Sequence, residues 1–184
     1  MSDSDVFIIS AVSNTDSVQA IRQAIQNAGA DSLRVQDVIF GSDGSRSIDV
    51  EKILSASNLT CSAATVSSSL RATFFAAQSI LSFDAEVVIV IGIETNSSTA
   101  ILLASPDAVG RWNLMPCARL AARSLTGINS AFRTAELESK DVTVIKDGKY
   151  GTMLIKEVLD ELEQNSGRWG MVTTNELALL IERI

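Results

Sequence analysis

The segment from residue 67 to residue 83 is apolar on nearly every face that a helix would present. Only Arg71 and Gln78 within it are strongly polar. The apolar side chains of this segment are Leu70, Ala72, Phe74, Phe75, Ala76, Ala77, Ile80 and Leu81. A helix that is hydrophobic all round is stable only when other elements cover it. The sequence therefore predicts a chain built in layers around this buried helix.

Short apolar segments of strand length alternate with helical patterns along the rest of the chain. We expect strands at residues 5–12, 35–40, 61–66, 85–93, 99–103, 119–124, 142–145, 169–173 and 177–181. We expect further helices from Thr15 or Asp16 up to Gly29, at 47–56 and at 151–165. This alternation is typical of an α/β protein. The last two strands have no helix between them, which indicates a mixed sheet.

Length, composition and charge narrow the classes of partner. The 184 residues are 46% apolar and 20% charged, which suits one compact body or two small halves packed together. The net charge of −7 argues against non-specific binding to nucleic acid. The longest apolar run, 87–91, is far below the roughly 20 residues of a membrane helix. Because the N-terminus is acidic and does not resemble a signal peptide, we expect a cytoplasmic protein.

The chain contains no histidine and only two cysteines, Cys61 and Cys117. Without an imidazole, Ser-His and Cys-His mechanisms are excluded, and the commonest zinc ligand is absent. The spacing of the cysteines matches no metal or redox motif, so we expect reduced thiols and no metal site. Each cysteine is more simply interpreted as a small apolar side chain than as a nucleophile.

Three groups of segments resemble the thiolase family. Residues 66–72 (V-S-S-S-L-R-A), 76–80 (A-A-Q-S-I) and 84–97 (D-A-E-V-V-I-V-I-G-I-E-T-N-S) are similar to its C-A-S-G-L-Q-A, its A-A-Q-A-I and its strand ending G-G-x-E-x-M-S. Residues 98–105, Ala108 and 116–119 resemble the D-G-A-A-A-V-L-L-A-S…A…P-L-A-R that follows. Residues 148–162, 168–172 and 181–183 resemble the closing G-A-S-G-A-R-L-L-V-T-L-L-H-E-L, R-Y-G-L-A and I-E-R.

The resemblance implies an abbreviated thiolase-like α/β fold, with layers of helices and mixed five-stranded sheets around the buried helix. Residues 1–118 would form an N-terminal half and residues 119–184 a shortened C-terminal half, packed as one body. Members of the family are longer. The loop domain that covers their coenzyme A tail would fall between Ser97 and Ser98, and the second half is shortened between Arg119 and Val142.

The same resemblance places the catalytic positions of the family on residues unsuited to its chemistry. Val66 stands where the family has a nucleophilic cysteine, at the start of a helix whose N-terminus helps to form the thiolate. Ile145 lies near the position of the catalytic histidine. The C-x-G loop that carries the acid/base cysteine is replaced by a turn at 173–176. We therefore expect no catalytic residues and no thiolase or ketoacyl-synthase activity.

Polar residues near the helix start and the strand ends are candidates for binding. The serines at 67–69 suit N-capping better than catalysis. Glu94 matches a family glutamate and either binds a ligand, acts as a base or, more simply, hydrogen-bonds a neighbouring loop. The candidate binding residues are Ser67, Ser68, Glu94, Asn96 and Asn175. Asn96, Asn175 and Glu176 also fit ordinary turn positions.

Two functions from different classes fit these residues. The first is a non-catalytic thiolase-like subunit or scaffold that dimerises with itself or with an active thiolase-family protein. The family pairs one strand across a two-fold axis, and here the dimer strand would be Cys61, Ser62, Ala63, Ala64, Thr65 and Val66. The alternative is an acyl-CoA-dependent acyltransferase or acyl-CoA binder with altered chemistry, in which the helix N-terminus holds the acyl group of a coenzyme A thioester.

Overall fold

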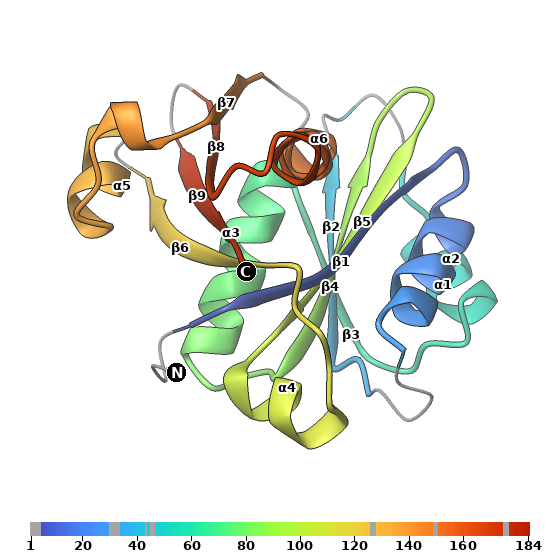
Figure 1. Ribbon diagram of the computed structural model, residues 1–184. Coiled ribbons are helices and arrows are strands. Elements are labelled where there is room, and N and C mark those ends of the chain that lie inside the picture. Colours follow the sequence, from blue (N-terminus) through green and yellow to red (C-terminus); the bar gives the residue numbers. More distant parts are fainter. Residues whose placement is uncertain are drawn as a thin grey trace.

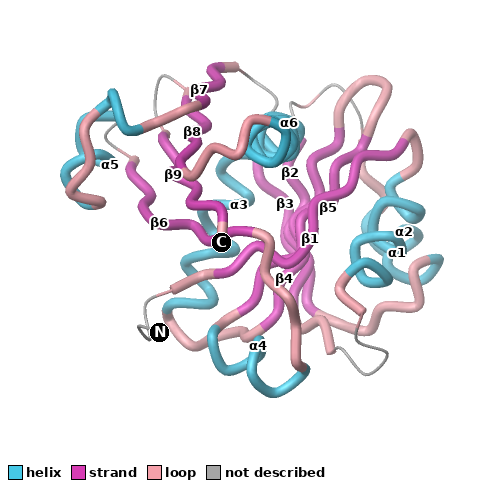
Figure 2. The backbone as a smooth tube through the Cα atoms, viewed as in Figure 1, coloured by secondary structure: helices cyan, strands magenta, loops and turns pink. Residues whose placement is uncertain are grey.

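The computed structural model describes residues 5–29, 34–42, 44, 47–125, 128–148, 151–174 and 177–184. Figures 1 and 2 show strands and helices alternating along the chain. The strands are β1 (Phe7–Asn14), β2 (Asp37–Ser42), β3 (Ser62–Val66), β4 (Val87–Ile93), β5 (Ser98–Ala104), β6 (Ala118–Ser124), β7 (Val144–Asp147), β8 (Trp169–Thr173) and β9 (Ala178–Arg183). The helices are α1 (Ser17–Asn27), α2 (Val50–Ala56), α3 (Ser69–Leu81), α4 (Pro106–Trp112), α5 (Ile128–Thr134) and α6 (Gly151–Gln164), with a 3-10 turn at Ser139–Asp141.

The strands form one continuous mixed sheet in the order β3-β2-β4-β5-β1-β6-β9-β8-β7. Strand β2 is parallel to β3 and β4, and β7 is parallel to β8, whereas the other pairs are antiparallel. Only two residue pairs join β1 to β6, Phe7 with Arg119 and Ile8 with Ala118. The sheet bends at this joint into a five-stranded part and a four-stranded part (Figure 1). The expected mixed five-stranded sheet is present as the first part, and the second part has four strands.

The two parts repeat one topology. The first runs β1, α1, β2 and later α3, β4, β5, and the second runs β6, α5, β7, α6, β8, β9. Each strand of β2-β4-β5-β1 has its counterpart at the same place in β7-β8-β9-β6. Both first strands also shift register at a matching point, between Ile8 and Ser10 in β1 and between Leu120 and Ala122 in β6. Within the described residues the second part has no counterpart of α2 and β3, which explains its missing strand.

Helices and sheet alternate as five layers (Figure 1). Helices α1 and α2 cover the outer face of the five-stranded part, α3 and α6 lie between the two parts, and α5 covers the outer face of the four-stranded part. Three separate clusters of buried apolar side chains fill the spaces between layers. In the middle cluster, Leu70 of α3 and Ile155 of α6 pack with strand residues such as Val90 and Leu179. The predicted layering around a central helix is confirmed.

Helix α3 is covered on most sides but not on all of them. The Ser68 side chain caps its N-terminus by accepting a hydrogen bond from the Arg71 N–H. Arg71, Phe75 and Gln78 lie three or four residues apart and form an exposed stripe, in which the Phe75 side chain is 47% exposed. The expected burial is therefore incomplete along this stripe.

The observed bounds agree with the expected ones to within a few residues for most elements. Helices α4 and α5 were not expected, because the apolar residues in these two short segments show no clear helical spacing. The helix expected from residue 47 starts only at Val50, where the Asp49 side chain caps it. In the described part of the chain, no helix has both the length and the apolar character needed to cross a membrane.

Candidate functional site

The two central helices, α3 and α6, begin against one another. A Cβ atom added to Gly151 at the start of α6 would collide with Leu70 of α3, so only glycine permits this approach. A Cβ atom on Gly92 of β4 would likewise collide with the Thr152 side chain. The Thr152 N–H donates to the Ser69 Oγ at 3.3 Å and ties the two helix starts together. The carboxyl end of β4 thus meets two helix N-termini, a common location for ligand sites in α/β proteins.

Val66, Ser67 and Ser68 form the turn from β3 into α3. The Ser68 Oγ lies 3.5 Å from the Arg71 backbone nitrogen, the geometry of a weak N-cap. Val66 is the last residue of β3, and its half-buried side chain packs against the middle cluster. Because valine has no nucleophilic or titratable group, this position offers no covalent chemistry.

Glu94 and Asn96 lie in the turn between β4 and β5. The buried Glu94 carboxylate accepts a hydrogen bond from the Ser97 hydroxyl at 3.2 Å, and its backbone N–H donates to the Ser97 carbonyl at 2.9 Å. These bonds close the turn that contains Glu94 itself, whereas the bond expected for Glu94 was to a neighbouring loop. Asn96 is exposed in the same turn. Asn175 and Glu176 lie outside the described residues.

Thr152 is the polar residue of this region that the sequence analysis missed. Its side chain is fully buried, and Oγ1 has no hydrogen-bond partner among the described residues. A buried hydroxyl without a partner is costly, so such groups are rare in native structures. The family pattern G-A-S-G-A has alanine at the position where this chain has Thr152, and that difference was the available signal.

The remaining candidates lie apart from this meeting point. Ile145, near the expected position of the catalytic histidine, belongs to β7 and is 48% exposed. Cys61 precedes β3, and burial together with the charge of Asp37 raises the pKa of its thiol. Cys117 precedes β6, and burial raises the pKa of its thiol to about 11. Both thiols are protonated at neutral pH, so neither is a ready nucleophile.

Strand β3, the predicted dimer strand, is an edge of the sheet. Among the strands of the described residues it pairs with β2 alone, and Ser62, Ala63, Ala64 and Thr65 are all exposed. The strand contains no proline and no charge, the features that natural edge strands use to prevent pairing. Its unpaired backbone groups are therefore open to another strand.

Comparison with known proteins finds likeness in structure and not in sequence. No family model and no curated protein matches the chain. Among solved structures, the Bacillus anthracis acetyl-CoA acetyltransferase has a TM-score of 0.88 at 11% identity, over 98% of this chain and 99% of that chain. Human mitochondrial 3-ketoacyl-CoA thiolase in complex with CoA has a TM-score of 0.86 at 12% identity, over 98% of both chains. A second structure of the human thiolase has a TM-score of 0.83 at 12% identity, over 97% of this chain and 98% of that chain.

The bent two-part sheet with two central helices defines a layered α/β protein. The likeness to these structures shows that the fold is thiolase-like, as the three groups of sequence motifs indicated. At 11% and 12% identity the likeness establishes the fold, and the activity has to be argued from the residues of this chain.

Proposed function

We propose that the chain is a non-catalytic thiolase-like subunit that pairs through β3 with a second copy or with an active thiolase-family protein. The observation that carries this proposal is the join between β3 and α3. There an open edge strand ends in Val66, a residue without chemical reactivity, immediately before the central helix. We place this subunit in the cytoplasm, because Cys61 and Cys117 are both free thiols.

The side chains present support the proposed absence of catalysis. The whole chain has no histidine, and Val66 and Ile145 stand where the resemblance places the nucleophile and the catalytic imidazole. Cys61 is the nearest thiol in sequence, but the five residues of β3 separate it from the start of α3 by about 17 Å. The helix start therefore has no thiol to accept an acyl group from a thioester, and the serines there have no histidine to activate them.

Pairing through β3 is supported by the shape and chemistry of the edge. The exposed side chains of Ser62, Ala63, Ala64 and Thr65 are small, so a second strand can approach closely. The exposed Phe75 on α3 provides additional apolar surface. A strand pair together with part of the following helix is expected to exceed the roughly 1,000 Å² that marks a biological interface.

Sedimentation equilibrium tests the pairing. We expect the purified chain to be a dimer at micromolar concentration, or to co-purify from its native host with a thiolase-family protein identified by mass spectrometry. Ala64→Lys places a charge in the paired edge and should weaken association at least about tenfold. The control is Ala56→Lys, at the exposed last residue of α2. A folded monomer that captures no such partner contradicts the proposal.

The absence of catalysis is tested separately with acetyl-CoA and acetoacetyl-CoA. Intact-mass analysis should show no acyl adduct, and an assay for free coenzyme A should show no release above the rate without protein. Turnover that disappears in Cys61→Ala would assign that thiol a catalytic function. It would refute the proposal that the chain is non-catalytic but would leave the proposal of pairing through β3 untouched.

A binder of acyl-CoA is the second candidate, and one observation favours it. The unpartnered Thr152 hydroxyl lies beside the N-terminus of α3, where a carbonyl oxygen could accept its hydrogen bond. Isothermal titration with acetyl-CoA should then give saturable binding that Thr152→Val weakens. Equal affinity in the parent and in Thr152→Val, or no binding at all, removes this candidate.

A further inference from the structure

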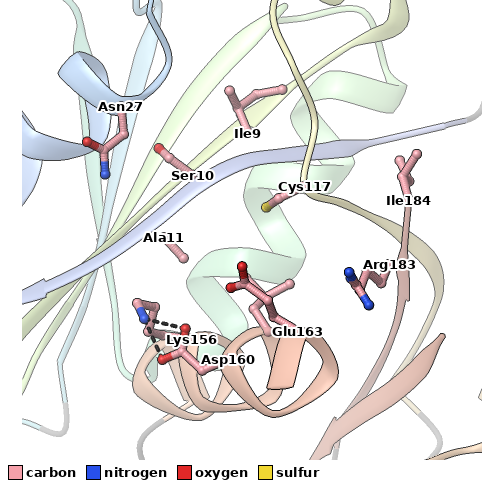
Figure 3. A pocket seen from close by; sticks show the side chains of 11 residues that line it. Ile9, Ser10, Ala11, Asn27, Cys117, Lys156, Asp160, Glu163, Arg183 and Ile184 are labelled. Atoms are coloured by element: carbon pink, nitrogen blue, oxygen red, sulfur yellow. Dashed lines mark hydrogen bonds and ion pairs between the residues drawn. The ribbon is translucent and has the colours of Figure 1, made fainter. Parts of the chain in front are cut away.

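A cavity of about 340 Å³ opens where the sheet bends from β1 to β6, away from the start of the central helices (Figure 3). Strands β1 and β6 pair only through Phe7 and Ile8, and β1 then shifts register across Ile9. A bulge of this kind turns the backbone and often accompanies a binding site. The volume suits a small organic molecule.

The cavity is lined by segments far apart in the sequence. Ile9, Ser10 and Ala11 come from β1, Asn27 from the end of α1, and Cys117 from the residue before β6. Helix α6 provides the opposite wall, and Arg183 of β9 lies at one end. In Figure 3 the Glu163 carboxylate extends from α6 between Lys156 and Arg183, with the Cys117 thiol across from it.

Two opposite charges in this cavity remain available to a ligand. The Arg183 guanidinium donates one hydrogen bond, from Nη1 to the Leu162 carbonyl at 3.2 Å, and makes no other with the described residues. The Glu163 side chain is exposed at the cavity, and its carboxylate makes no hydrogen bond or ion pair with any described residue. Lys156, in contrast, bonds both carboxylate oxygens of Asp160, so that these two charges neutralise each other.

The charges discriminate between classes of ligand. A simple anion would gain hydrogen bonds to Arg183 but would be repelled by the like charge of Glu163. A simple cation would be attracted by Glu163 but repelled by Arg183. A molecule carrying both charges satisfies both residues, because guanidinium binds carboxylate in a bidentate manner and carboxylate accepts from ammonium. Ile9, Ala11 and Leu159 offer apolar surface to the rest of such a molecule.

We propose that this cavity binds a small zwitterion with an apolar side chain, of the class of the aliphatic amino acids. Its carboxylate lies on Arg183, its ammonium on Glu163, and its hydrocarbon part against Ile9 and Leu159. A ligand held in this way connects α6 to the joint between β1 and β6 and therefore stabilises the folded chain. The site is independent of whether the chain dimerises through β3.

Isothermal titration tests the proposal with three molecules that share one hydrocarbon skeleton. The probes are L-leucine, 4-methylpentanoate, which lacks the ammonium, and 3-methylbutylamine, which lacks the carboxylate. For L-leucine we expect saturable binding with Kd on the order of 1 mM, as suits so small a ligand. Each analogue should bind at least about tenfold more weakly, because one charged hydrogen bond is lost.

Variants of the two charged residues assign the contacts. Glu163→Gln should weaken L-leucine about tenfold while leaving 4-methylpentanoate unchanged or tighter, and Arg183→Gln should weaken both. The control is Glu157→Gln on the same helix, whose carboxylate faces Lys146 outside the cavity. Circular dichroism confirms that each variant is folded. No saturable binding of L-leucine up to about 20 mM, equal affinity for all three probes, or no effect of Glu163→Gln overturns the proposal.

Discussion

Thr73 and Thr152 are both fully buried in the central helices but differ in their hydrogen bonding. The Thr73 hydroxyl donates to the Ser69 carbonyl at 3.2 Å, and the Thr152 hydroxyl has no partner among the described residues. Thr73→Val should therefore lower the free energy of unfolding by about 1 kcal/mol. Thr152→Val keeps the shape and removes an unsatisfied group, so it should leave stability unchanged or raise it. Urea unfolding of both variants is the measurement, and an equal loss in the two would show that Thr152 is hydrogen-bonded after all.

The thiol of Cys117 provides a second prediction for a single residue. Although the residue is partly open to solvent, desolvation of its sulfur raises the pKa of Cys117 to about 11, and the Sγ–H donates to the Ile8 carbonyl at 3.3 Å. At pH 8 only about one molecule in a thousand carries the thiolate, so alkylation should be slow and should accelerate about tenfold per pH unit up to pH 10. Cys61→Ser isolates this thiol, and intact-mass analysis after iodoacetamide follows the rate. A rate that levels off near pH 8.5 would contradict the raised pKa.

At the scale of elements, Glu182 joins three strand segments. Its carboxylate in β9 accepts hydrogen bonds from Arg119 of β6 and from Arg168, which precedes β8. Burial alone would raise the pKa of Glu182, but the two guanidinium groups outweigh it and hold that pKa below its ordinary value. The resulting stabilisation is complete above the unfolded pKa of about 4.3 and is lost as the pH falls through the lower folded pKa.

Glu182→Gln should therefore lower the free energy of unfolding at pH 7 by about 2 kcal/mol. This loss is smaller than that expected for a fully buried ion pair, because Arg168 is largely exposed to solvent. The difference from the parent should shrink as the pH falls below 4. Glu161→Gln, which removes a half-exposed ion pair with Lys146, is the matched control and should change stability much less than Glu182→Gln does. Thermal unfolding between pH 3 and pH 7 provides the comparison, and a pH-independent difference would speak against the ion pairs.

The elements that the sequence predicts well are those whose pattern is local. Strand β4 is fully buried over Val87–Ile93, and its continuous apolar run predicted a buried strand. Helix α4 was missed because Gly110 and Arg111 interrupt a stretch of seven residues. The start of β7 was placed two residues early, since Val142 is as apolar as Val144 but packs under α5. Such differences are decided by tertiary packing, which no local pattern contains.

At the scale of the whole molecule, the bend between β1 and β6 was not predictable. Two residue pairs form it, and neither Phe7 nor Arg119 carries a pattern that specifies a partner more than a hundred residues away. The cavity beside the bend could not be predicted from the sequence either, because Glu163 and Arg183 come together only after folding. The sequence motifs also did not predict that the starts of α3 and α6 meet. The burial of the Thr152 hydroxyl follows from that meeting, so no local pattern indicated it.

The same architecture determines how the chain unfolds. Helices α3 and α6 pack in one cluster with strands of both sheet parts, so neither part has a complete core of its own. We therefore expect the division at residue 118 to mark two halves of one cooperative body.

The chain has two tryptophans, and each reports on one half: Trp112 packs against the outer cluster of the first part and Trp169 against that of the second. Single-tryptophan variants, Trp112→Phe and Trp169→Phe, should each retain one probe.

In urea, the fluorescence of the remaining tryptophan should change at the same denaturant concentration as the circular dichroism of that variant, because a single transition between folded and unfolded states moves all probes together. The replaced ring lies at the edge of an outer cluster in both cases, so a modest shift of the midpoint common to both signals is expected. Leu70→Ala, which opens the middle cluster, should lower the midpoint for both tryptophan probes together by the equivalent of about 3 kcal/mol. If the Trp169 signal instead changed well before the Trp112 signal, the four-stranded part would be an independently unfolding unit, and the shared core would not be the element that unites the chain.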